Sequence, residues 1–151
     1  MIIIAACLLS LEPCLTLRDA DTGKIWIRLP VRDRSEFSIE FVHSVNQTPV
    51  RDAYVISGRE IQPVATYFYN FGAGMQTDLE EGQSLNHHPD GSMSITGFQQ
   101  SFKQLNYIVG TVSDHVLTID GKQVSLRELC GSNAAVTFAV EERIKIVFAS
   151  Q

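Results

Sequence analysis

His43 is the residue of this sequence best placed to do chemistry. It follows segment 37–41, where apolar side chains occupy every second position, so we expect its ring on the apolar side of a strand, at the strand's end. A half-buried imidazole needs hydrogen-bond partners. Three polar residues of the same predicted hairpin could supply them: Ser44, Thr48 and Asp52. We favour a structural histidine that locks the turn over one that contacts a ligand, and either role over catalysis.

A hydrolase combines a nucleophile, a base and an orienting acid, and Ser44, His43 and Asp52 supply these residue types. Neighbouring residues on a strand project to opposite faces, however, so Ser44 and His43 are poorly placed to form a hydrogen bond. The sequence also lacks the Gly-x-Ser-x-Gly motif that exposes a nucleophile at a sharp turn. We therefore assign no catalytic residue and expect a protein that is not an enzyme.

The histidines also raise the question of a metal site. His87 and His88 lie close to Asp90, and His115 follows further along the chain. Neighbouring histidines seldom bind one ion, and neither an HxH nor an HxxxH spacing is present. A solvated loop is the better interpretation, so we expect no metal and no cofactor.

Two glycines follow a predicted strand in the motif Phe71-Gly72-Ala73-Gly74. Such glycines let the backbone approach a neighbour closely, or expose successive N–H groups to an anion. Neither of the usual phosphate-binding glycine patterns is completed, so a tight corner in a barrel is favoured. The motif opens segment 72–91, the longest stretch without a strand pattern, where we expect a lid or a contact surface.

Short strands must position these residues. Apolar residues alternate with period two along most of the chain, and turn residues separate the runs. Two hairpins are well marked, one across Asp21-Thr22-Gly23 and one across Asp120-Gly121. Ser125 and Glu128 have the spacing of a capping box, which predicts a short helical turn. Pro63 cannot donate to a strand ladder and marks a bulge or an edge.

The predicted fold is therefore all-β. About nine or ten short strands, the last two at 136–140 and 144–148, indicate a single-domain antiparallel β-barrel or β-sandwich with one or two short helical turns. A length of 151 residues and a hydrophobic content of 44% suit one core. The net charge of −5, with Lys and Arg dispersed, argues against nucleic acid as a partner.

The N-terminal residues 1–13 form a hydrophobic segment before the β domain at 14–151. Their uncharged run is shorter than the roughly 20 residues of a membrane-spanning helix, but has the length of a signal-peptide core. The segment is either the remnant of an export signal or membrane anchor, or the first strand. Among the cysteines, Cys14 and Cys130 could form a disulfide in an oxidising compartment, although buried free thiols are favoured.

Several motifs occur in an order that resembles an uncharacterised bacterial family, number eighteen-fifty in the domain-of-unknown-function series. The motifs are His43-Ser44-Val45, Pro49-Val50-Arg51-Asp52-Ala53-Tyr54, Phe71-Gly72-Ala73-Gly74, Asp90-Gly91 and Val109-Gly110. The segment Arg18-Asp19-Ala20-Asp21-Thr22-Gly23 is similar to the family's N-terminal hairpin, and the resemblance covers roughly residues 15–140.

The chain departs from the family pattern at two residues and at its end. Asp52 stands where the family usually has glutamate, and Asn70 replaces a small hydroxyl residue. The tail 141–151 extends past the family's usual end. A polar site shared with the family would be slightly reshaped here.

The resemblance implies a context more than a reaction. Genes of this family commonly lie beside TAXI-type TRAP transporters, which implies an accessory protein at the outer face of the bacterial cytoplasmic membrane or in the periplasm. We therefore expect a non-enzymatic accessory domain that contacts the TAXI-type solute-binding protein or the TRAP permease. The alternative is a β domain that binds a small polar solute, and a cryptic hydrolase or metal enzyme is the least favoured function.

We expect the imidazole of His43, the carboxylate of Asp52 and the glycine corner to converge at one mouth of a closed sheet and to serve recognition. The residues that are candidates for binding a ligand or a partner are His43, Ser44, Thr48, Asp52, Tyr54, Asn70, Phe71, Gly72, Ala73, Gly74 and Asp90.

Overall fold

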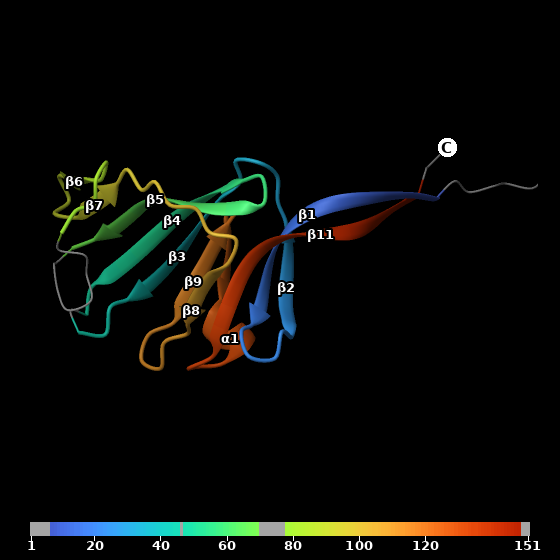
Figure 1. Cartoon of the computed structure of the whole chain (residues 1–151). Helices are drawn as coiled ribbons and strands as arrows, with labels where there is room; N and C mark the ends of the chain where they lie inside the picture. Colours follow the sequence, from blue (N-terminus) through green and yellow to red (C-terminus); the bar gives the residue numbers. More distant parts are fainter. Residues whose placement is uncertain (1–6, 46, 70–77, 149–151) are drawn as a thin grey trace, which may run out of the picture.

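The computed structural model describes residues 7–45, 47–69 and 78–148. These residues form eleven strands and one short helix (Figure 1), which confirms the all-β prediction. The elements are β1 (Cys7–Asp19), β2 (Ile25–Pro30), β3 (Glu36–Val42), β4 (Pro49–Ser57), β5 (Glu60–Phe68), β6 (Ser84–His87), β7 (Met93–Thr96), β8 (Leu105–Ile108), β9 (His115–Ile119), β10 (Lys122–Ser125), α1 (Leu126–Cys130) and β11 (Ala135–Phe148). No helix in the described part of the chain is long and apolar enough to cross a membrane.

The strands form two antiparallel sheets. The smaller sheet has the order β2-β1-β11-β8, and the larger has the order β10-β9-β3-β4-β5-β7-β6. The first and last strands, β1 and β11, pair along the whole of β1, from Cys7 opposite Phe148 to Asp19 opposite Val136. The described strands do not show the closed barrel that was one of the two predicted architectures.

One core fills the space between the two sheets. Leu15 and Phe138 of the smaller sheet and Ile39 and Leu117 of the larger sheet are buried in the same apolar cluster. Each such side chain contributes about 1.5–3 kcal/mol by leaving water, so this cluster is what holds the sheets together. A smaller apolar cluster around Phe68 closes one end of the larger sheet.

The predicted hairpin turns and the predicted helix cap are confirmed, because residues close in sequence determine them. The β1–β2 turn contains Gly23 with φ 72°, and the β9–β10 turn has positive φ at both Asp120 and Gly121, as a type I′ hairpin requires. The side-chain oxygen of Ser125 accepts a hydrogen bond from the N–H of Glu128 at 3.0 Å and caps α1. These turns set the registers of two hairpins.

Pro63 lies next to a bulge, one of the two positions predicted for it. The pairing of β4 with β5 shifts by one residue between Ala53 and Tyr54, which lies opposite Pro63. A proline has no N–H to donate, and a bulge removes the need for one.

Two strand predictions are wrong. The last two predicted strands are a single strand, β11, because Glu141 and Arg143 do not interrupt it: they form ion pairs with Arg18 and Glu12 of β1. The segment 72–91, predicted to be irregular, contains strand β6, which pairs with β7. In both places polar side chains lie on a regular backbone whose hydrogen bonds come from a neighbouring strand.

Beyond the sheets, β1 and β11 continue as a two-stranded ribbon, which we call the arm; it consists of residues 7–12 and 143–148 (Figure 1). In the described chain no strand pairs with the outer edges of the arm, since β2 pairs with β1 only from Cys14 to Arg18, and β8 with β11 only from Ala135 to Phe138. The hydrophobic segment predicted for residues 1–13 thus contributes the first half of a strand from residue 7 onwards.

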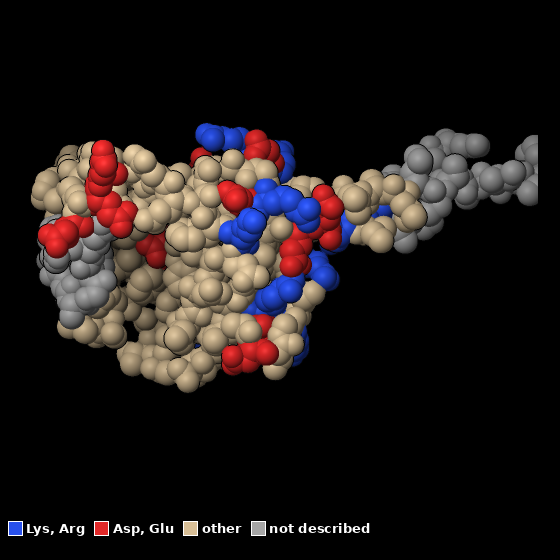
Figure 2. Space-filling view, viewed as in Figure 1, with Lys and Arg blue, Asp and Glu red and all other residues tan. Residues whose placement is uncertain are grey.

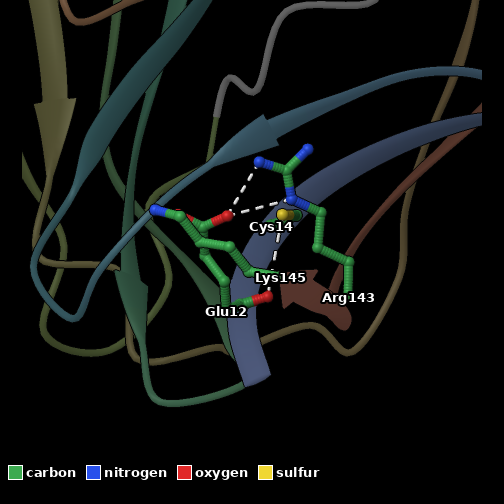
Figure 3. Close-up of polar contacts among 4 residues, drawn as sticks. All are labelled: Glu12, Cys14, Arg143 and Lys145. Atoms are coloured by element: carbon green, nitrogen blue, oxygen red, sulfur yellow. Dashed lines mark hydrogen bonds and ion pairs between the residues drawn. The ribbon is translucent and has the colours of Figure 1, made fainter. Parts of the chain in front are cut away.

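One face of the arm carries charges. The carboxylate of Glu12 accepts hydrogen bonds from Nε and Nη2 of Arg143, at 2.9 and 2.7 Å, and from Nζ of Lys145 at 3.3 Å (Figure 3). The bond with Arg143 is the main reason why the pKa of Glu12 is lowered. On the molecular face drawn in Figure 2, the Lys and Arg atoms gather on the half of the body from which the arm projects.

Candidate functional site

The turn after β3 contains His43, and its hydrogen bonds are local. The N–H of His43 donates to the carbonyl oxygen of Thr48, and the N–H of Gln47 donates to the carbonyl oxygen of His43, both at 2.9 Å. The ring nitrogen Nδ1 of His43 accepts a hydrogen bond from the N–H of Val45 at 3.3 Å. Thr48 is thus a partner of His43 through its backbone, and the ring supports the turn.

His43 and Ser44 line an open cleft of about 350 Å³ together with Val109 and Gly110; we call it the His43 cleft. Two of the motifs noted in the sequence, which lie more than sixty residues apart, therefore meet here. A side chain at Gly110 would collide with the carbonyl oxygen of Ser113, so the loop after β8 requires glycine at this position. Ser113 in turn donates its hydroxyl to the carbonyl oxygen of Val42 at 2.7 Å, which ties the loop to the end of β3.

His115 also lines the His43 cleft. Its ring stacks on Phe41 with centroids 4.7 Å apart, and its Nδ1 accepts a hydrogen bond from the N–H of Gly110 at 3.1 Å. Burial lowers the pKa of His115, so the neutral ring is favoured. Arg127 of α1 holds the same loop, since its Nη2 donates to the carbonyl oxygen of Gly110 at 3.2 Å.

Asp52 and Tyr54 belong to a polar cluster between the sheets. The Asp52 carboxylate accepts hydrogen bonds from the Thr66 hydroxyl at 2.9 Å and from the Tyr107 hydroxyl at 2.8 Å. The hydroxyls of Tyr54 and Tyr107 are 2.6 Å apart, and Tyr54 stacks on Phe37. Because β8 belongs to the smaller sheet and β4 to the larger, the cluster connects the two sheets.

The cluster shifts the titration of its members. Desolvation raises the pKa of Asp52 above the ordinary 3.8, and outweighs the hydrogen bonds from Tyr107 and Thr66, which act in the opposite direction. Desolvation, followed by the nearby charge of Asp52, also raises the pKa of both Tyr54 and Tyr107. The two phenols therefore remain protonated donors, and the carboxyl group is poised to keep its proton to a higher pH than an exposed one.

The expected convergence of His43 with Asp52 is not what the structure shows. Asp52 lies opposite Ile39 on β3, four residues before His43, with its side chain directed between the sheets. Four residues of strand span about 13 Å, too far for a shared polar site. The prediction assumed that polar residues of one hairpin lie together, but β4 begins at Pro49 and carries Asp52 away from the turn and into the core.

A second cleft, which we call the Arg51 cleft, lies at the same end of the larger sheet and has a volume of about 580 Å³. Its polar and aromatic lining includes Glu40, Arg51, Tyr67, His88, Asp90 and Ser92. Of these, the sequence prediction contained only Asp90. Strand parity could have indicated Glu40 and Arg51, because each alternates with core residues of β3 and β4 and must face outwards.

The remaining candidates are placed as follows. Asp90 lies in the turn between β6 and β7, where its Oδ1 accepts hydrogen bonds from the N–H and hydroxyl of Ser92 at 3.0 and 2.7 Å. The candidates Asn70, Phe71, Gly72, Ala73 and Gly74 lie outside the described residues. His43 and Asp90 thus share one end of the larger sheet but line different clefts.

The groups gathered at this end of the larger sheet can offer hydrogen bonds, charge and aromatic surface. Within residues 7–45, 47–69 and 78–148, no group of three or more His, Cys, Asp or Glu side chains is arranged to hold a metal ion. Cys14 and Cys130 are both free thiols, as favoured from the sequence. The polar atoms of the Asp52 cluster bond to one another, which gives this cluster a structural role.

Comparison with known proteins gives one match. The chain matches the model of a domain of unknown function, DUF1850, over residues 37–126. The match includes the His43, Asp90 and Gly110 motifs, but not the hairpin around Gly23. Searches among curated proteins and among solved structures found no match. Because the matched segment covers more than half of the sequence, the chain belongs to the DUF1850 family.

Proposed function

We propose that the chain is a non-enzymatic accessory domain associated with a TAXI-type TRAP transporter, and that it contacts the solute-binding protein or the permease. The transporter association is supported by the gene context that the family resemblance implies. The same context supports a location at the outer face of the bacterial cytoplasmic membrane or in the periplasm. The contact itself is supported by a feature of the fold.

That feature is the apolar face of the arm. The side chains of Leu9, Leu11 and Ile144 lie on one side of the ribbon, opposite the charged face, and are 69%, 65% and 67% exposed. A two-stranded ribbon is marginally stable by itself in water, and a row of exposed large apolar side chains favours association. The arm thus has the properties of a surface that a partner protein covers.

The edges of the arm specify how a partner could bind. Neither outer edge pairs with a strand in the described chain, so its N–H and C=O groups can pair with an added strand. An extended segment of a transporter protein with alternating apolar residues would cover Leu9, Leu11 and Ile144 while it extends the sheet. We propose this mode of contact.

Co-purification tests the proposal. The tagged chain is co-expressed with the neighbouring solute-binding protein and permease, and retention of each is measured in mild detergent. We expect the wild-type chain to retain one of them, and the variant Leu9→Ser/Leu11→Ser to lose it. Leu79→Ser is the matched control, because Leu79 is also an exposed leucine, 47% accessible, but lies outside the arm.

The outcomes separate the two parts of the proposal. If the wild-type chain retains neither transporter protein, the accessory function is wrong. If the arm variant retains its partner as well as the Leu79→Ser control does, the arm is not the contact surface.

Binding of a small polar solute is a second candidate function, favoured by the Arg51 cleft. A volume of about 580 Å³ with convergent polar groups is typical of small-molecule sites. A thermal-shift screen of the purified chain against carboxylates and amino acids tests this function. A concentration-dependent rise of the melting temperature supports it, and a flat response across the screen contradicts it.

A further inference from the structure

A row of side chains crosses the outer face of the larger sheet at the Arg51 cleft. Glu40 of β3 lies opposite Arg51 of β4, which lies opposite Tyr67 of β5, which lies opposite Ser94 of β7. Directly opposed residues on antiparallel strands have Cβ atoms about 4.5–5.5 Å apart. The charged and aromatic groups of the cleft are therefore neighbours that the sheet itself positions.

Arg51 is oriented by its aromatic neighbour. Its guanidinium carbon lies 4.3 Å from the centre of the Tyr67 ring. The His88 ring centroid lies 6.1 Å from that of Tyr67, and His88 is fixed by a 2.9 Å hydrogen bond between its Nε2 and the Ser94 hydroxyl. A guanidinium that stacks on a ring keeps its N–H groups in its own plane, where they can bind a carboxylate through two parallel hydrogen bonds.

Carboxylates of opposite sign to Arg51 line the same cleft. Glu40 is its direct neighbour on β3, and Asp90 reaches the cleft from the β6–β7 turn. Hydrogen bonds from Ser92 keep the pKa of Asp90 below its ordinary value, so this group is charged at neutral pH. The cleft therefore presents one guanidinium and two carboxylates beside an aromatic surface.

We propose that the Arg51 cleft binds a zwitterionic α-amino acid with an apolar side chain. The ligand carboxylate would pair with Arg51, its ammonium would face Glu40 and Asp90, and its side chain would lie against the aromatic wall. A ligand with only negative charge would be repelled by Glu40 and Asp90, and one with only positive charge would be repelled by Arg51. This inference rests on the second candidate function, solute binding.

A matched series of probes tests the charge pattern. L-phenylalanine, 3-phenylpropanoate and phenethylamine share a phenyl side chain but carry both charges, only the carboxylate or only the ammonium. Their dissociation constants for the full chain are measured by titration calorimetry. We expect L-phenylalanine to bind at least about tenfold more tightly than either analogue, because each analogue leaves one charged group of the cleft unpaired.

Two variants assign the charges to residues. Arg51→Gln should weaken L-phenylalanine about tenfold, to the affinity of phenethylamine, because the carboxylate loses its partner. Glu40→Gln should weaken L-phenylalanine but strengthen 3-phenylpropanoate, because it removes a repulsion. Arg59→Gln is the matched control, since Arg59 is exposed in the β4–β5 turn at the other end of β5. Unchanged melting temperatures show that each variant is folded.

The results distinguish the ligand class from the function. If 3-phenylpropanoate binds as tightly as L-phenylalanine and Arg51→Gln weakens both, the zwitterion is wrong but solute binding stands. If none of the three probes binds, the inference is overturned, and the wider thermal-shift screen decides whether the cleft binds any solute. If Arg59→Gln weakens L-phenylalanine as much as Arg51→Gln does, the ligand does not bind in this cleft.

Discussion

Tyr107 donates a hydrogen bond of 2.8 Å to Asp52 across a sequence separation of 55 residues, and this bond joins the two sheets. Tyr107 belongs to β8 of the smaller sheet, and Asp52 to β4 of the larger one. When Asp52 is ionised, Tyr107 donates its hydroxyl proton to the carboxylate in a hydrogen bond. Tyr54 must then donate the 2.6 Å hydrogen bond between the two phenols. The three groups form a chain of hydrogen bonds that ends at the carboxylate.

Removing the central hydroxyl should destabilise the fold. Tyr107→Phe leaves the ring in place but deprives Asp52 of one donor and Tyr54 of its partner. We expect the free energy of unfolding to fall by about 1–3 kcal/mol, as is typical when desolvated polar groups lose their partners. Urea unfolding followed by tryptophan fluorescence measures the change. Tyr69→Phe is the control, because Tyr69 is 40% exposed, and an equal loss in both variants would contradict the role of the cluster.

The raised pKa of Asp52 predicts the sign of a pH effect. Between the unfolded value near 3.8 and the raised folded value, the folded state holds more protons than the unfolded state. The contribution of Asp52 to stability is therefore fully present below pH 3.8 and is lost as the pH rises through the folded pKa. Asp52→Asn cannot ionise and should lack this loss.

The measurement is the difference in unfolding free energy between the wild-type chain and Asp52→Asn, from urea unfolding at a series of pH values from 3 to about 8. We expect the wild-type chain to lose stability relative to the variant as the pH rises. Glu12, Asp19 and Asp90 have lowered pKa values and therefore add stability as the pH rises. Their effect is the same in both chains, so it cancels in the difference. A difference that grows in favour of the wild-type chain would mean that the carboxylate is stabilised in its charged form.

The hairpins could be predicted from the sequence, whereas the cluster could not. Asp120 and Gly121 decide their turn by their own conformational preferences, and Ser125 caps a helix only three residues away. The contact between Asp52 and Tyr107 depends on the packing of two sheets, and no local pattern encodes which residues of β4 and β8 will face each other. For the same reason, the sequence did not reveal that His43 and Asp52 lie apart.

The charged residues of β11 show a second limit. Glu141, Glu142 and Arg143 in succession are typical of a loop, but each strand face receives only alternate residues, and β1 supplies partners for two of them.

Arg51 was not among the predicted site residues for a related reason. An exposed charge on a strand is ordinary in a sequence, and Arg51 becomes a candidate for binding only because the register places Glu40 and Tyr67 beside it.

The free thiols predict slow chemical modification. Burial raises the pKa of Cys14, and it raises that of Cys130 to about 11, so at pH 8 about one Cys130 in a thousand is a reactive thiolate. In a Cys7→Ser background, Ellman's reagent should react with these two thiols at least tenfold faster in urea than in the folded state. If two thiols per chain react in urea without reductant, both cysteines are free. If no thiol reacts, the two cysteines are paired in a disulfide.

His43→Ala tests whether the ring serves the turn or a partner. The ring accepts the N–H of Val45 at 3.3 Å, so we expect its loss to lower the free energy of unfolding by about 1 kcal/mol. His43→Asn, whose side-chain oxygen can accept the same N–H, should recover most of this stability, and Ser44→Ala on the exposed neighbouring residue should change little. Urea unfolding measures the free energy of unfolding of the three variants. The co-purification assay measures how well each variant retains the transporter protein.

The combination of the two measurements decides between the roles. A loss of stability that Asn restores, with the partner still retained, assigns His43 to the turn. Normal stability with a lost partner assigns it to the contact, because the ring lines an open cleft where a partner side chain can reach it. In that case Gly110→Ala should also weaken retention, since the collision with the carbonyl oxygen of Ser113 displaces a loop that lines the same cleft.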